Sequence, residues 1–177
     1  EALRNAVVKA YPKLSHRYYE LKRKWLGVEK LEIWDRNAPL PMESERIVDW
    51  QEAQDIVTTA YSEFDPLMAE LAEPFFKKGW IDAPVKPGKA PGAFAHPTVT
   101  NVHPYIMLNY LGKPRDVMTL AHELGHGIHQ TLAAKQGEFL SSTPLTLAET
   151  ASVFGEMLTF QKMLERAQDK NERKVML

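Results

Sequence analysis

Apolar side chains recur every three or four positions near the start of the chain, the spacing of one face of an α-helix. We therefore expect an amphipathic helix over residues 2–26, ended by Gly27, because glycine readily adopts the left-handed conformation found after helix C-termini. An extended connector is predicted over residues 37–42, where two prolines oppose regular structure. The apolar stripe of this first helix comprises Leu3, Val7, Tyr11, Leu14, Tyr18, Leu21 and Trp25.

Two more helices are predicted before the middle of the chain. The first of them covers residues 47–64. Asp65 followed by Pro66 is typical of a helix N-cap and first turn, so the next helix runs from there through Lys78 and ends at Gly79. Residues 1–81 are thus expected to form a helical segment.

Proline and glycine are concentrated over residues 82–92, where they oppose both a helix and a central strand. We interpret this stretch as the main internal boundary. The segments 93–96 and 103–109 that follow are short and rich in aromatic and β-branched residues, which predicts a small β-sheet.

The remainder of the chain predicts two helices. Asp116 is expected to cap a helix that runs to about residue 134, and Thr143 with Pro144 to open a final helix after a turn-rich stretch. The predicted fold class is therefore mainly α, with a small sheet before these helices in residues 92–177. The apolar faces are Val117, Ala121, Leu124, Ile128 and Leu132 in one helix, and Leu147, Ala151, Phe154 and Leu158 in the other.

Composition narrows the classes of protein. The 177 residues are 44% hydrophobic and 25% charged, which is typical of one globular domain. The net charge of -1 provides no basic surface for nucleic acid or an anionic membrane, and no apolar run is long enough to cross a bilayer. Cysteine is absent and no export signal is visible, which favours the cytoplasm. Because the chain starts with Glu1 and stops within a helix-favouring run, we expect a fragment.

Residues 122–126 read His-Glu-Leu-Gly-His and match the H-E-x-x-H pattern within a predicted helix. Residues four positions apart lie about one turn apart on the same side of a helix, so His122 and His126 can bind one ion. Neutral imidazole suits Zn²⁺, and a catalytic zinc site adds a third protein ligand and leaves a position for water. Glu123 is the candidate general base that accepts a proton from the attacking water. The pattern predicts hydrolysis of amide bonds with one zinc ion.

The third ligand stays open on the residues alone. The metzincin pattern requires a histidine at position 132, where the sequence has Leu132, and this excludes that class. A carboxylate from the next helix is the other common solution. Glu149 and Glu156 are the candidates there, and Glu138 in the preceding turn is a further one.

Six segments carry a further signal: Thr119–His129, Pro144–Ser152, Gly92–Phe94, His103–Tyr110, Tyr18–Lys22 and Trp34–Asp35. Together they resemble the oligoendopeptidase F branch of the thimet oligopeptidase family, over most of the chain. The resemblance implies a zincin-like helical metallopeptidase core, with residues 1–177 as a single partial catalytic domain. It also implies that His122, His126 and Glu149 hold the zinc ion and that Glu123 is catalytic.

The resemblance implies short peptides as substrates, held as an added strand by the region before the zinc helix, a role that residues 92–109 fit. Family members are several times longer, and their tyrosine and histidine residues that stabilise the oxyanion lie downstream of this chain. The alternative is therefore a zinc-binding helical fragment or interaction module with little or no turnover. Another zinc carboxypeptidase or gluzincin lineage is a second rival. Apolar surface left exposed would favour self-association.

Three more residues are candidates for substrate binding. His129 continues the face of His122 and His126, and it could contact substrate or orient a ligand; the competing interpretation is a histidine with local hydrogen bonds only. His103 could line the cleft or belong to a turn. Tyr105 could supply a phenol or only pack within its strand.

Overall fold

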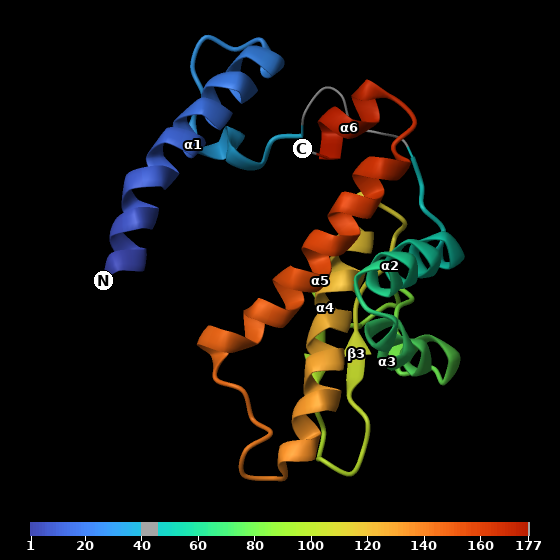
Figure 1. The fold of residues 1–177 in the computed structure, drawn as a ribbon. Helices are drawn as coiled ribbons and strands as arrows, with labels where there is room; N and C mark the ends of the chain where they lie inside the picture. Colours follow the sequence, from blue (N-terminus) through green and yellow to red (C-terminus); the bar gives the residue numbers. More distant parts are fainter. Residues whose placement is uncertain (40–45, 177) are drawn as a thin grey trace. The chain divides into compact units, whose positions relative to one another are not determined.

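The computed structural model describes residues 1–39 and 46–176 (Figure 1). The chain forms two compact units. One unit comprises the described part of residues 1–45 together with Asp169–Val175, and the other comprises Arg46–Gln168 and Met176. The second unit contains all three described strands and the H-E-x-x-H sequence. None of the described helices combines the length and apolar character needed to cross a lipid bilayer.

The first unit is built on the long helix α1 (Ala2–Leu26), which confirms the predicted boundaries. Gly27 ends it with a φ of 66°, as expected. A short 3-10 helix, η1 (Ile33–Asn37), follows, and Lys22 ties it to α1 by donating to the Arg36 carbonyl at 2.8 Å. Within this unit the predicted stripe is left uncovered: the exposed fractions of Leu3, Tyr11 and Leu14 are 78%, 65% and 66%.

The short helix α6 (Lys170–Met176) completes the described helices. The connector predicted over residues 37–42 is wrong at Asn37, which is the last residue of η1, whereas residues 38 and 39 have no regular structure. Its residues 40–42 lie outside the described residues.

The second unit starts with α2 (Trp50–Phe64) and α3 (Pro66–Lys77). Asp65 caps α3 as predicted, and its carboxylate accepts from the Leu67 N–H at 2.9 Å. The predicted start of α2 at residue 47 is wrong by three positions. Asp49 is the N-cap, because its carboxylate accepts from the Glu52 N–H, so the first helical residue is Trp50.

A small sheet has the strand order β1-β3-β2, with β1 (Ile81–Asp82) parallel to β3 (Tyr105–Met107) and β2 (Phe94–His96) antiparallel to it. The strands β2 and β3 confirm the predicted segments, whereas β1 was missed because two residues beside a proline-rich stretch show no alternation. Lys89 secures that stretch by donating to the carbonyls of Asp82, Pro84 and Leu108.

The helix of the H-E-x-x-H sequence is α4 (Pro114–Ala133), followed by the 3-10 helix η2 (Ala134–Gln136). The prediction that Asp116 is the N-cap of this helix is wrong. Asp116 lies in the first turn of α4, and its carboxylate accepts hydrogen bonds from the Leu111 and Lys113 N–H groups. Proline at the first helical position starts the helix earlier. The predicted apolar face is buried from Val117 to Ile128, whereas Leu132 is 40% exposed.

The last helix of this unit is α5 (Leu145–Arg166), which runs antiparallel beside α4 (Figure 1). Its predicted apolar stripe is wrong at Leu147 and Phe154, which are 60% and 39% exposed. The buried positions are Ser152, Gly155, Thr159 and Met163. Small side chains occupy this face because the two helix backbones approach closely, so periodicity of large apolar residues could not identify it. The fold class, mainly α with a small sheet before α4, is confirmed.

Candidate metal centre

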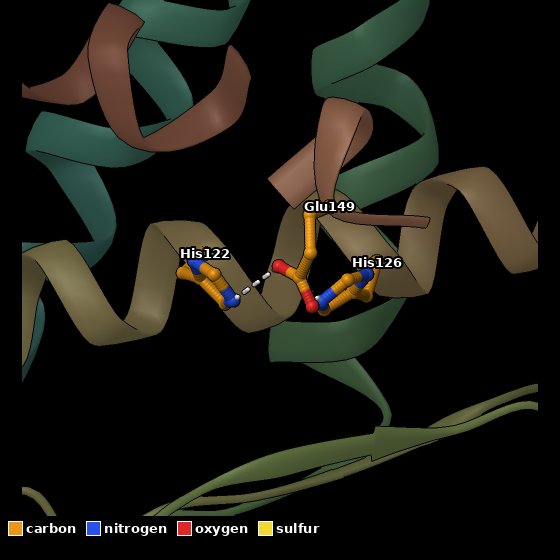
Figure 2. A group of neighbouring side chains, drawn as sticks. All are labelled: His122, His126 and Glu149. Atoms are coloured by element: carbon orange, nitrogen blue, oxygen red, sulfur yellow. Dashed lines mark ion pairs between the residues drawn. The ribbon is translucent and has the colours of Figure 1, made fainter. Parts of the chain in front are cut away.

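The two histidines of α4 and one glutamate of α5 converge on a common point (Figure 2). His122 and His126 lie one turn apart on α4, and the antiparallel helix α5 brings Glu149 opposite them. The Oε2 atom of Glu149 lies 3.3 Å from Nε2 of His122 and 3.5 Å from Nε2 of His126. One ligand atom from each residue lies within 4.8 Å of the others.

These separations fit a tetrahedral zinc ion. With Zn–N and Zn–O distances of about 2.0–2.1 Å, neighbouring ligand atoms at a tetrahedral centre are about 3.4 Å apart. The two nitrogen to oxygen distances of 3.3 and 3.5 Å agree with that value. Two imidazoles and one carboxylate are also the donor set that a catalytic zinc site uses. The side chains are therefore compatible with one zinc ion.

Close packing of the two helices places Glu149. A Cβ atom on Gly125 would lie 2.6 Å from the Ala151 carbonyl oxygen and 2.9 Å from Ser152 Cα, so only glycine fits there. The buried Ser152 hydroxyl donates to Glu149 Oε2 at 2.7 Å. This hydrogen bond is the main cause of the lowered pKa of Glu149, and the nearby histidines lower the pKa further. Glu149 is therefore held as a carboxylate.

Glu123 and His126 have pKa values shifted in opposite directions. The Glu123 side chain is buried, and burial raises its pKa, supported by the charge of Glu149 and opposed by that of His122. Burial lowers the pKa of His126, and Glu149 opposes this effect. The shift favours neutral imidazole at His126, the form that binds metals, while Glu123 has an increased affinity for a proton.

The other two acidic candidates lie in different surroundings from Glu149. Glu156 Oε2 lies 3.2 Å from Nδ1 of His122, on the other side of that ring from Glu149. Glu138 accepts a hydrogen bond from the Thr100 hydroxyl. The structure therefore brings only Glu149, of these three, to the Nε2 atoms of both histidines.

A cavity of about 400 Å³ adjoins the centre. Its lining includes His126, His129 and Gln130 from α4, residues 97–100 after β2, and Glu138 with residues 141–143 before α5. Sequence reasoning had selected His129, but not Gln130 or Ser152. The Glu-x-x-Ser spacing of residues 149–152 could have identified Ser152, because a hydroxyl three positions further along a helix can reach back to the glutamate side chain.

His103 and Tyr105 lie in an aromatic group rather than in the described lining of this cavity. The His103 ring stacks on Trp80 with ring centroids 3.8 Å apart, and the Tyr105 and His103 ring centroids are 4.5 Å apart. Their assignment to substrate binding stays a prediction.

Comparison with known proteins finds similarity over most or all of the chain. The sequence profile of the family described as Peptidase family M3 matches residues 1–177. Oligopeptidase PepF of Bacillus subtilis is 27% identical over 161 residues, which are 90% of this chain and 24% of that protein. An oligoendopeptidase F homolog of Borreliella burgdorferi is 31% identical over 163 residues, or 89% of this chain and 27% of the homolog.

The same similarity is found among solved structures. A crystal structure from Chlamydophila abortus, described as that of a peptidase, superposes with a TM-score of 0.79 at 30% identity. The superposition covers 97% of this chain and 29% of the other. The chain thus spans about a quarter of the length of the curated relatives it matches.

Proposed function

The chain belongs to peptidase family M3, as its resemblance to the oligoendopeptidase F branch predicted, and we propose that it is the metal-binding core of a zinc endopeptidase for short peptides. The convergence of His122, His126 and Glu149 is the observation that carries this proposal. The relatives' names, oligopeptidase and oligoendopeptidase, support short peptides as the substrate class. Residues 1–177 are proposed to belong to a single catalytic domain.

The proposed chemistry divides between the metal and Glu123. His122 Nε2, His126 Nε2 and a carboxylate oxygen of Glu149 would hold the ion. A zinc ion bound there would supply Lewis acidity, which would polarise the scissile carbonyl and increase the acidity of water. Glu123 accepts the proton of the attacking water and later donates it to the leaving amine.

The proposed peptide site lies along the sheet edge and the adjoining cavity. Among the described residues β2 is an edge strand in the order β1-β3-β2, which supports pairing with an extended peptide that would replace the Gln130 side chain at the Ala95 carbonyl. His129 lines the cavity beside His126, which supports a contact with substrate. His103 and Tyr105 remain proposed contacts outside that cavity.

The test measures turnover and bound metal in the same sample. Zinc-loaded protein is incubated with an internally quenched peptide of mixed sequence, and zinc per chain is determined. Glu123→Gln keeps the size of the side chain but removes the base, so we expect zinc to be retained and cleavage to be lost. Glu165→Gln serves as a matched control, because Glu165 is exposed on α5 and pairs with Lys162.

Three results would contradict the proposal. Cleavage that survives in Glu123→Gln refutes the assigned base. One zinc per chain without any cleavage favours the alternative, a zinc-binding fragment without turnover. Removal of C-terminal residues alone favours a carboxypeptidase lineage.

A further inference from the structure

His122 contacts one carboxylate at each of its ring nitrogens. Glu149 Oε2 lies 3.3 Å from Nε2, and Glu156 Oε2 lies 3.2 Å from Nδ1. Both glutamates come from α5, two turns apart, and the antiparallel packing of α4 and α5 places them on opposite sides of one imidazole.

The position of Glu156 excludes it from the same coordination sphere as Glu149. The two nitrogens of an imidazole ring point in different directions in the ring plane. A carboxylate that is hydrogen-bonded to Nδ1 is therefore too far from an ion at Nε2 to bind it. A neutral imidazole carries one N–H and one acceptor nitrogen. When Nδ1–H donates to Glu156, the acceptor lone pair is on Nε2, on the side of Glu149 and His126.

We propose that Glu156 is a positioning residue, which fixes the ring orientation and the metal-binding tautomer of His122. This inference rests on the proposed zinc site. A carboxylate that accepts from a liganding histidine raises the basicity of the ligand, and loss of such a partner weakens metal binding by about 10- to 100-fold. Glu156 is only partly exposed, with 37% of its side chain accessible, so solvent weakens this contact less than at an open surface.

The experiment compares zinc affinities by competition with a chromophoric chelator. Glu156→Ala removes the acceptor, and we expect zinc to bind about 10- to 100-fold more weakly. Glu156→Gln keeps an amide oxygen at the same reach, so its affinity should lie between those of Glu156→Ala and the wild type. Glu165→Ala on the same helix removes the same charge at an exposed site and should leave the affinity unchanged.

A spectroscopic measurement separates positioning from a purely structural role. Long-range ¹H–¹⁵N spectra of the zinc-loaded protein report which nitrogen of His122 carries the proton. We expect a protonated Nδ1 that exchanges slowly with water in the wild type and at least about tenfold faster in Glu156→Ala, where solvent replaces the carboxylate. Thermal melting of the metal-free variants reports folding separately.

The outcomes distinguish this inference from the zinc site itself. Wild-type affinity in both Glu156 variants, or no rescue by glutamine relative to alanine, overturns the positioning role while His122→Ala still abolishes binding. Zinc binding that is unaffected by His122→Ala and Glu149→Ala overturns the proposed site, and this inference with it. Should Glu156→Ala not fold, the glutamine variant and the proton exchange of His122 decide the question.

Discussion

Gly125 lies inside the H-E-x-x-H sequence, between the two histidines proposed to bind the metal, and faces the backbone of α5. Replacing it with alanine adds one methyl group. That carbon would lie 2.6 Å from the Ala151 carbonyl oxygen and 2.9 Å from Ser152 Cα, whereas ordinary contact begins at 3.4 Å. Helix α5 must therefore retreat by about 0.8 Å near residue 151 to restore normal contact. Glu149, two residues away, moves with it.

The effect on stability combines two opposing contributions. Overpacking a close contact costs about 1–3 kcal/mol, and the rigid backbone on the other side places Gly125→Ala toward the upper end. Replacing glycine by alanine in a helix interior contributes about 1 kcal/mol of stability. We expect a net loss of about 1–2 kcal/mol in the free energy of unfolding of the metal-free protein.

The effect on zinc affinity should be larger than this loss of stability alone would cause. Metal ligands must be held within about 0.5 Å of their productive positions, and a shift of α5 by about 0.8 Å exceeds that tolerance. We expect Gly125→Ala to bind zinc at least about tenfold more weakly under conditions where the protein is fully folded. Chelator competition measures the affinity, and urea denaturation measures the stability.

Gly127→Ala provides the matched control. Its added methyl would also be crowded, at 2.8 Å from the Phe75 ring and 3.3 Å from Ile106 Cδ1, but these are side chains on another face of α4. We expect a stability loss of about 1–2 kcal/mol with zinc affinity unchanged in the folded protein. Wild-type zinc affinity in Gly125→Ala, or an equal loss of affinity in Gly127→Ala, would refute the reasoning.

Three further predictions concern other contacts. Ser152→Ala removes the hydrogen bond that orients the Glu149 carboxylate, so zinc affinity measured by chelator competition should fall severalfold. Burial raises the pKa of Tyr61, so the folded chain keeps a proton that the unfolded chain releases; the free energy of unfolding should fall as pH rises above about 10, and less so in Tyr61→Phe, by urea denaturation. Lys89→Met removes the donor to three carbonyls and should lower stability by about 2–3 kcal/mol without changing zinc affinity. A Ser152 variant with unchanged affinity, a pH slope unaffected by Tyr61→Phe, or an altered zinc affinity in Lys89→Met would each contradict the corresponding contact.

Local patterns predicted most helices because their determinants are close in sequence. Asp65 with Pro66 identified the start of α3, and Gly27 the end of α1. Prediction failed where tertiary packing decides the outcome. The face of α5 that packs on α4 carries Ser152 and Gly155 because the backbones come close, and no apolar periodicity reveals such a face.

The candidate site also has a part that local sequence predicts and a part that only tertiary packing determines. His122 and His126 could be paired from their spacing alone, because one helical turn sets their distance. Glu149 and Glu156 lie two turns apart on nearly the same face of α5, so helix geometry cannot distinguish them. The register between α4 and α5 places Glu149 at the Nε2 atoms and Glu156 at Nδ1 of His122, and register is a property of long-range packing.

X-ray absorption of the zinc-loaded protein tests the proposed metal centre most directly, because it counts the imidazole ligands and measures their distances. We predict one zinc ion with two imidazole nitrogens and oxygen ligands at about 2.0–2.1 Å in four-coordinate geometry. In Glu149→Ala the two imidazoles should remain while the protein oxygen is lost. A spectrum that requires one or three imidazoles, or a six-coordinate shell of oxygens, would contradict the site formed by His122, His126 and Glu149.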